Sequence, residues 1–257
     1  MDANCSKKYT RWLLPLLLVI GHCLNPGAAL GAGRNENAQQ IVAKADEIRF
    51  PQEDFQMDLT ITSSSDGQND VHKYQILSKG SDKTVVITTY PPSERGQILL
   101  MKDRDLWAYM PDVSQPIRLS LAQRLTGQVA NGDLTRANFS GDYHATLLKT
   151  ETIDGQDHNV LELNAADPGV TYHRVIYWVN EANFRPYKAE FYSASGRLMK
   201  TCLYTDFRQA EGKLRPTRLI MEDALRKGEK SVLEYSNLHK RKISDKVFTK
   251  DYLKKLQ

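Results

Sequence analysis

Residues 105–143 read DLWAYMPDVSQPIRLSLAQRLTGQVANGDLTRANFSGDY and interrupt an otherwise strand-like sequence. An aromatic, strand-like run ends at Pro111, and small, amide and acidic residues are then interleaved with single large apolar ones. The strands of a hairpin alternate regularly and their turn is short, so this stretch is not an ordinary hairpin. It predicts a long ordered loop, which in a β-rich domain is usually functional, and its aromatic residues argue against disorder.

Strand signals lie on both sides of this loop. In residues 55–62 the apolar side chains of Phe55, Met57, Leu59 and Ile61 alternate with polar ones, which is the period of a half-buried strand. Similar patterns predict further strands at 70–78, 84–90, 97–102, 106–110, 145–153, 159–165, 172–179, 186–192, 198–207, 214–222 and 231–237. Turn residues separate them at intervals of roughly 10 to 15 residues, which favours an antiparallel meander over βαβ units.

Helices are predicted only near the two ends of the chain. Residues 35–49 place Ile41, Ala45 and Ile48 on one helical face, and a second helix is predicted at residues 244–256. Strongly twisted sheets of about ten strands curl. A curled sheet has a concave face that must be filled or occupied. We therefore expect a mainly β chain with some α: one curved antiparallel sheet in a single domain, covered by these helices and the long loop.

The first 31 residues have the pattern of a secretory signal peptide. Lys7, Lys8 and Arg11 make its start positive, and residues 12–24 form its apolar centre. Residues 28–32 offer small side chains for cleavage. We therefore predict export, with a signal peptide over residues 1–31 and a mature domain over residues 32–257.

Two alternatives to this cleavage stay open. The segment could remain as an uncleaved anchor, although its apolar run is shorter than the ~20 residues that a membrane span needs. It could also be a lipoprotein signal ending at Cys23, although the bulky His22 precedes that cysteine. Cleavage leaves Cys202 as the one cysteine, so no intramolecular disulfide forms and the fold depends on a hydrophobic core. We expect Cys202 to be a buried small hydrophobe.

Charge is distributed unevenly along the chain. The formal net charge is +4, yet from Leu225 onward ten Lys or Arg residues stand against four Asp or Glu residues. A solvated surface explains such a basic end, and so does attraction to an anionic membrane or partner.

The sequence offers little that would support catalysis. None of the five histidines of the mature chain has a partner at metal-binding spacing, and there is no Gly-x-Ser-x-Gly elbow. Asp133 and Asp142 are the best candidates for an acid–base pair, but Asp beside glycine is more often a turn former, and His144 is similarly ambiguous. Nucleic-acid binding is disfavoured because the basic residues cluster apart from the aromatic ones. We predict no catalytic residue, no metal and no cofactor.

Four motifs of the long loop stand in a characteristic order. They are LWAYMP at 106–111, PIRLS at 116–120, QRLTGQVANGD at 123–133 and RANFSGDY at 136–143. With ADEIR at 45–49 before the first strand, this order resembles the bacterial outer-membrane lipoprotein-sorting protein family, the LolA-like or Lol-carrier-like superfamily. The similarity covers nearly all of the mature chain. It implies an incomplete β-barrel of about 10–11 strands, covered by a few helices over an apolar cavity.

The resemblance also implies a function. A periplasmic carrier of a Gram-negative bacterium would shield acyl chains of a lipid or lipidated protein during transport towards the outer membrane. An inner-membrane transporter and an outer-membrane acceptor are its expected partners, and nucleic acid is not. The alternative is a substrate-binding accessory of an inner-membrane lipid-exporting transporter, and a periplasmic enzyme comes third.

Carriage depends on apolar area, because each buried methylene contributes about 0.8 kcal/mol. The expected lipid-binding residues are Met57, Leu59, Ile61, Met101, Trp107, Tyr109, Phe139 and Tyr143. Methionine and aromatic side chains suit an adaptable lipid pocket, and equally an ordinary core. The candidates for a headgroup phosphate are Arg118, Arg124 and Arg136, because Arg binds phosphate in bidentate geometry. Which alternating face of the strands is concave stays open.

The long loop has two possible roles over such a cavity. Its aromatic residues could shape a gate at the cavity mouth that moves about Gly127, Gly132 and Gly141. The rival interpretation is a fixed plug whose aromatic side chains belong to the core. Replacing Phe139 separates the two, since a plug residue loses stability and a gate residue loses ligand affinity.

Overall fold

The structure is a computed structural model that describes Met1 and residues 26–111, 113–136, 138–253 and 255. Most of the predicted signal peptide, including Cys23, lies outside these residues. Helix α1 (Pro26–Arg49) begins inside the predicted signal segment and is longer than the helix predicted at residues 35–49. No helix in the described part of the chain is both long and apolar enough to cross a membrane.

Thirteen antiparallel strands form one large sheet, in the order β6-β5-β4-β3-β2-β1-β15-β14-β13-β12-β11-β10-β9. The strands are β1 (Phe55–Ser65), β2 (Gln68–Lys79), β3 (Lys83–Tyr90), β4 (Ile98–Lys102), β5 (Asp105–Tyr109), β6 (Ile117–Leu119), β9 (Tyr143–Ile153), β10 (Gln156–Ala165), β11 (Arg174–Asn180), β12 (Pro186–Tyr192), β13 (Leu198–Ala210), β14 (Lys213–Asp223) and β15 (Lys230–Lys240). Two meanders, β1 to β6 and β9 to β15, are joined where the first and last strands pair.

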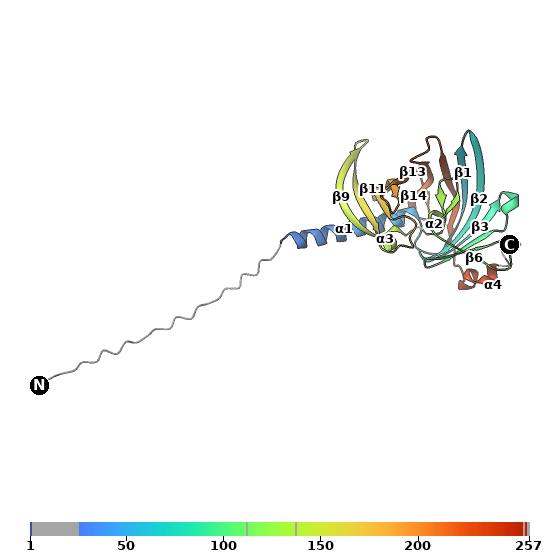
Figure 1. Ribbon diagram of the computed structural model, residues 1–257, viewed down its shortest axis with the longest axis horizontal. Coiled ribbons are helices and arrows are strands. Elements are labelled where there is room, and N and C mark those ends of the chain that lie inside the picture. Colours follow the sequence, from blue (N-terminus) through green and yellow to red (C-terminus); the bar gives the residue numbers. More distant parts are fainter. Residues whose placement is uncertain (2–25, 112, 137, 254, 256–257) are drawn as a thin grey trace.

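The sheet curves, so that β9 stands on one side of the short helices α2 (Asn131–Thr135) and α3 (Phe139–Asp142) and β1 and β2 stand on the other (Figure 1). Strands β6 and β9 each pair on one side only, so the sheet is not closed into a barrel. The predicted fold class, a curved antiparallel sheet that forms an incomplete barrel with few helices, is confirmed.

Alternating burial explains why the strands form. Phe55, Met57, Leu59 and Ile61 of β1 are buried, whereas the residues between them are only partly covered. This alternation is the period of a strand with one face on a core. The predicted strand at residues 55–62 is therefore confirmed, and β1 extends three residues further.

The sheet has thirteen strands instead of the expected 10–11, and the long loop supplies one of them. A short strand, β6, forms within it and adds to the edge of the sheet. Strands β7 (Arg124–Thr126) and β8 (Val129–Ala130) form a separate small hairpin. Such two- and three-residue strands carry no periodic pattern, so the sequence does not reveal them.

The helix predicted at residues 244–256 is wrong. Two single turns occupy this part of the chain, the 3₁₀ helix η2 (Asp245–Phe248) and the helix α4 (Lys250–Leu253). Phe248 and Leu253 are buried in a cluster with residues of β2 to β5, so packing on the sheet overrides the helical pattern.

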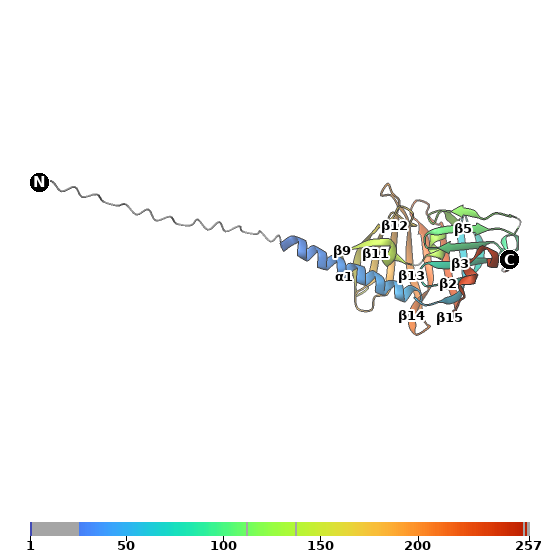
Figure 2. The same cartoon turned by 90° about the horizontal axis from the view of Figure 1, so that it is seen from below.

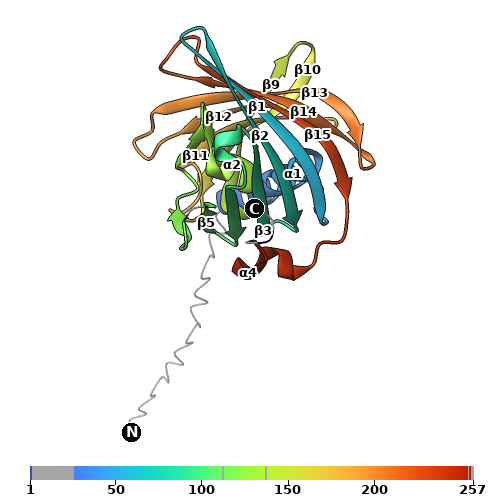
Figure 3. The same cartoon turned by 90° about the vertical axis from the view of Figure 1, so that its right-hand side faces the viewer.

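The two faces of the sheet are covered by different parts of the chain. Helix α1 crosses the concave face and contacts β9, β11, β12 and β14 (Figure 2). The C-terminal segment lies on the opposite face, next to β3 (Figure 3). The concave face therefore holds the larger core, and the loop between β5 and β9 covers it.

Candidate ligand-binding cavity

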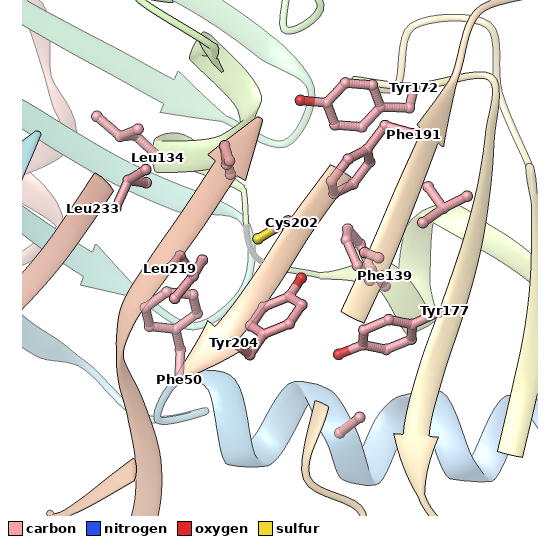
Figure 4. Packing of buried hydrophobic residues seen from close by; sticks show 14 of the residues in the cluster. Phe50, Leu134, Phe139, Tyr172, Tyr177, Phe191, Cys202, Tyr204, Leu219 and Leu233 are labelled. Carbon is pink, nitrogen blue, oxygen red and sulfur yellow. The ribbon is translucent and has the colours of Figure 1, made fainter. Parts of the chain in front are cut away.

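One continuous apolar cluster, here called the concave core, lines the inner face of the sheet. Figure 4 shows Tyr177, Cys202 and Tyr204 of the strands above α1 with Phe139 of the loop, and Leu134 of the loop farther away beside Leu233. Cys202 is fully buried, and burial raises the pKa of its thiol to about 12. The predicted burial of Cys202 is therefore confirmed.

Aromatic rings anchor the loop in this core. The ring of Phe139 packs edge-on against Tyr143, with centroids 5.6 Å apart, and against Tyr177, with centroids 5.4 Å apart. Phe139 is 8 % exposed. Such edge-to-face pairs contribute about 0.5–1.5 kcal/mol beyond the buried area. Phe139 is thus integrated into the core of the folded protein.

A small space, here called the inner pocket, lies between the end of α1, strands β1 to β3 and helix α2. Phe55, Met57, Ile76 and Leu134 supply its apolar walls. Its volume is about 30 Å³, which holds roughly two water molecules. Pockets for small organic ligands measure about 300–1,000 Å³. The inner pocket is therefore too small to hold such a ligand.

The covering segment, residues 113–136 and 138–142, is held on the sheet by a buried ion pair. Nζ of Lys200 in β13 lies 2.8 Å from Oδ2 of Asp133 in α2. Asp133 also accepts hydrogen bonds from the Tyr172 hydroxyl and the Ala130 amide, each at 2.8 Å. Its carboxylate therefore links α2 to the sheet.

A second ion pair fixes the end of the covering segment. Asp142 accepts hydrogen bonds from Nη2 of Arg136 at 2.7 Å and Nη2 of Arg104 at 3.3 Å. Nη1 of Arg136 donates to the Asp103 carbonyl at 2.7 Å. The side chains of Arg136 and Asp142 are 9 % and 7 % exposed. Asp133 and Asp142, the candidate acid–base pair, thus each neutralise a buried cation.

Close packing also explains two glycines of the covering segment. A Cβ on Gly127 would lie 2.0 Å from Oγ of Ser63, and a Cβ on Gly132 would lie 1.9 Å from Oγ1 of Thr171. Gly127 has a φ of +49°, which also favours glycine. Both residues let the segment approach the rest of the domain closely.

Arg49, the last residue of α1, places a cation inside the concave core. Its side chain is 8 % exposed, and its Nη1 donates to Oδ1 of Asp46 at 3.2 Å. Its Cζ lies 4.2 Å from the centre of the Phe139 ring. Burial acts to lower the pKa of Arg49, but the nearby Tyr204, Tyr177 and Asp46 outweigh this effect and raise it. The guanidinium therefore stays charged.

A second space, here called the rim pocket, opens beside the β7–β8 hairpin and the start of β13. Its volume is about 170 Å³, and Arg124, Arg197 and Lys200 contribute to its wall. Met199 and Leu225, which also line it, are 40 % and 61 % exposed. Basic groups beside exposed apolar groups suit an amphipathic ligand.

The structure places the expected lipid-binding residues in three clusters. Met57, Leu59, Ile61, Phe139 and Tyr143 lie together in the concave core. Met101 is buried in a small cluster with Leu106 and Leu121. Trp107 and Tyr109 lie in the cluster on the opposite face, under the C-terminal segment.

The three headgroup candidates lie apart from one another. Arg118 is on the edge strand β6, where it pairs with Asp105 and is largely exposed. Arg136 is committed to its buried pair with Asp142. Arg124 alone of the three lines a pocket described above, the rim pocket.

Sequence reasoning missed Arg49 and Lys200. Arg49 follows Val42 and Ala45 by seven and four residues, so it is a charged residue on the apolar stripe of a helix. Lys200 alternates with Cys202 and Tyr204 on the buried face of β13. In both places a charge that breaks an apolar period was the available signal.

The fold and its covered concave core define an open β half-barrel. A family model described as "Uncharacterized protein" matches residues 80–255. A LolA superfamily protein from Nitrosomonas europaea is 61 % identical, with a TM-score of 0.81, and the match covers 84 % of this chain and 98 % of that one. The chain belongs to the LolA superfamily, which confirms the family resemblance.

More distant structures share the fold. A putative outer membrane lipoprotein-sorting protein domain from Vibrio parahaemolyticus is 23 % identical, with a TM-score of 0.74, and the match covers 86 % of this chain and 99 % of that one. A DUF1329 family protein from Desulfovibrio piger is 22 % identical with the same TM-score and coverage. No curated protein matches the chain.

Proposed function

We propose that this protein is an exported, periplasmic carrier that shields acyl chains of a lipid or lipidated protein on the way towards the outer membrane. Membership of the LolA superfamily supports a carrier role. The Vibrio relative, described as a lipoprotein-sorting protein domain, suggests the class of cargo. The protein acts by binding, without a catalytic step.

The concave core is the observation that carries this proposal. Aromatic and methionine side chains line a curved sheet, and the covering segment contributes only the short edge strand β6 to that sheet. Movement of the part that follows β6 would expose apolar surface and leave the sheet paired. A chain of a dozen methylenes would then gain about 10 kcal/mol from burial, before the costs of ordering.

Ligand uptake requires the contacts that hold the covering segment on the sheet to break. Moving α2 away from the sheet separates Asp133 from Lys200 and from the Tyr172 hydroxyl. An acyl chain that enters the concave core replaces the contacts of Leu134 and Phe139. The apolar gain of the chain therefore has to exceed the loss of this buried polar network.

The alternative, a substrate-binding accessory of an inner-membrane lipid-exporting transporter, uses the same cavity and differs in its partners. A carrier meets an inner-membrane transporter and then an outer-membrane acceptor, whereas an accessory stays with the transporter. Release of bound lipid to outer-membrane vesicles in the absence of the transporter distinguishes them, because only the carrier completes this transfer.

Native mass spectrometry of protein purified from periplasm tests the proposal. We expect a co-purified lipid or lipopeptide, lost on delipidation and regained from vesicles. The matched control is Leu134→Asp, which places a carboxylate beside the inner pocket and should abolish reloading. Protein that carries no lipid and cannot be loaded contradicts the proposal. N-terminal sequencing of the same sample tests export, and a chain that starts at Met1 contradicts cleavage.

A further inference from the structure

Two buried polar atoms of the concave core have no hydrogen-bond partner among the described residues. They are Nε of Arg49 and the hydroxyl oxygen of Tyr177. Arg49 is 8 % exposed and Tyr177 is fully buried. Nearly all buried polar groups in folded proteins are hydrogen-bonded, because an unpaired one is destabilising. Two such groups in one cluster indicate a site for a ligand atom.

The two groups share the same neighbours. Phe139 contacts both residues, with its ring centre 4.2 Å from Cζ of Arg49 and 5.4 Å from the ring centre of Tyr177. The ring of Tyr204 lies 5.8 Å from Cζ of Arg49 and 6.1 Å from the Tyr177 ring. Figure 4 shows Tyr177 and Tyr204 side by side above α1. A cation and neutral hydroxyl donors thus meet in one apolar region.

The geometry of the guanidinium defines what it can bind. Nη1 of Arg49 is engaged with Asp46, and the unpaired Nε belongs to the other edge of the group. That edge carries two parallel N–H bonds, which match the two oxygens of a carboxylate. Among the described residues, Asp46 bonds the guanidinium through Oδ1 alone, because its Oδ2 accepts the Ser140 amide at 2.7 Å. The Nε–H of Arg49 is therefore left for another acceptor.

The inner pocket adjoins this site through Phe50, the residue after Arg49. Phe50 and Phe55 line the pocket, and Cζ of Arg49 lies 5.9 Å from the Phe50 ring. A chain attached to a carboxylate at Arg49 would continue past Phe50 between Met57 and Leu134. Its polar end and its apolar end would each meet a matching surface.

We propose that Arg49 and Tyr177 bind the carboxylate of a single-chain fatty acid, which the protein holds with its acid end inside the concave core. This inference rests on the proposed carriage of acyl chains and specifies the ligand class and its orientation. The rim pocket faces solvent and does not take part. A phospholipid, whose headgroup is larger and hydrated, would bind with its head outside and gain nothing from Arg49.

Isothermal titration calorimetry on the delipidated mature protein at neutral pH tests the inference. The probes are a saturated sixteen-carbon fatty acid and its methyl ester, which lacks the charge. We expect the acid to bind at least about tenfold more tightly, as one charge-assisted hydrogen bond provides. Tyr177→Phe removes only the hydroxyl, so it should weaken acid binding several-fold and leave ester binding unchanged.

Two further variants make the result specific. Tyr109, an expected lipid-binding residue, lies in the cluster on the opposite face, away from the proposed site. Tyr109→Phe deletes a buried hydroxyl that has no partner among the described residues, and both affinities should stay unchanged. Arg49→Lys keeps the charge beside Asp46 but removes the planar fork, so it should abolish the preference for the acid. Neither Tyr→Phe variant should lower the melting temperature of the apo protein, because each deleted hydroxyl makes no hydrogen bond to a residue that the structure describes.

The outcomes separate this inference from the proposed function. Equal binding of acid and ester by the native protein overturns the carboxylate site and leaves acyl-chain carriage intact. A loss of affinity for both probes in Tyr177→Phe also overturns it, since the residue would then act through packing. Binding of neither probe, nor of phospholipid from vesicles, overturns the carrier proposal together with the site.

Discussion

Replacing Lys200 by methionine removes one charge of the buried pair that joins α2 to the sheet. The side chains of Lys200 and Asp133 are 7 % and 8 % exposed, and their charged atoms are 2.8 Å apart. Removal of one partner from a buried pair typically costs about 3–5 kcal/mol, because the other charge is left unpaired. Asp133 keeps the donors of Tyr172 and Ala130. We therefore expect a loss at the lower end of this range, about 3 kcal/mol of unfolding free energy.

Urea unfolding of a double-mutant cycle measures this interaction. Asp133→Asn is the matched partner, because it removes the charge and keeps the shape. Interacting residues show coupling energies of about 0.5–3 kcal/mol. We expect the double variant to lose at least about 1 kcal/mol less than the two single losses combined. Losses that add to within about 0.5 kcal/mol would show that the pair does not hold the cover.

Hydrogen exchange locates the effect. If the covering segment opens as a unit, Lys200→Met should lower amide protection over residues 121–135 and leave the central strands β1 and β15 protected. Protection that falls evenly over the sheet would mean that the cover leaves only when the whole domain unfolds. A carrier would then need a different access route to its core.

Four further outcomes are expected. Gly132→Ala should destabilise the protein by about 1–3 kcal/mol in thermal melts, since its Cβ would lie 1.9 Å from Oγ1 of Thr171, and Thr171→Ala should restore part of the loss. Phe139→Ser should lower the free energy of unfolding of the apo protein by about 3 kcal/mol or more, because Phe139 is only 8 % exposed. An unchanged melting temperature together with a loss of lipid affinity would favour a gate. Burial raises the pKa of Cys202 to about 12, so almost no thiolate is present at pH 8. Cys202 should therefore not react with a thiol reagent at pH 8 until the protein unfolds, and rapid labelling of the native protein contradicts this. Replacing the basic residues at 240–242 by glutamine should reduce association with anionic liposomes. Liposome binding by the unmodified protein should also weaken with salt, because the screening length falls from about 10 Å at 0.1 M to 3 Å at 1 M. Liposome binding that is the same in the variant and at high salt indicates that the basic end is only a solvated surface.

The sheet could be predicted from the sequence because its strands have a period. The alternation of Phe55, Met57, Leu59 and Ile61 marks β1 without reference to other residues. Period alone says that alternate residues lie on opposite faces, but it does not say which face curves inward. Trp107 and Leu106 illustrate this limit: both are apolar neighbours in β5, and they pack in clusters on opposite sides of the sheet.

The candidate site was less accessible to sequence reasoning because its polar contacts join distant segments. Asp133 and Lys200 are 67 residues apart, and nothing local in either stretch identifies the partner. The close approach of Ser63 to Gly127 and of Thr171 to Gly132, which requires the absence of a side chain, also joins segments that are distant in sequence. Arg49 was hidden for a different reason, since a basic residue at a helix C-terminus is also what the helix dipole favours.

The pairing of β1 with β15 constrains the order in which the chain can fold. Leu59 lies opposite Tyr235, so the ladder at the middle of the sheet closes a loop of more than 170 residues. Contacts so distant in sequence form late in folding, because the entropy cost of closing the loop comes before the contacts contribute any favourable free energy. Until β15 is in place, β1 and β14 each present an unpaired edge, and such edges pair readily with other chains. A chain cut before Lys230 would therefore have two separate meanders, with β1 and β14 as unpaired edge strands. We expect such a chain to aggregate more readily than the full chain.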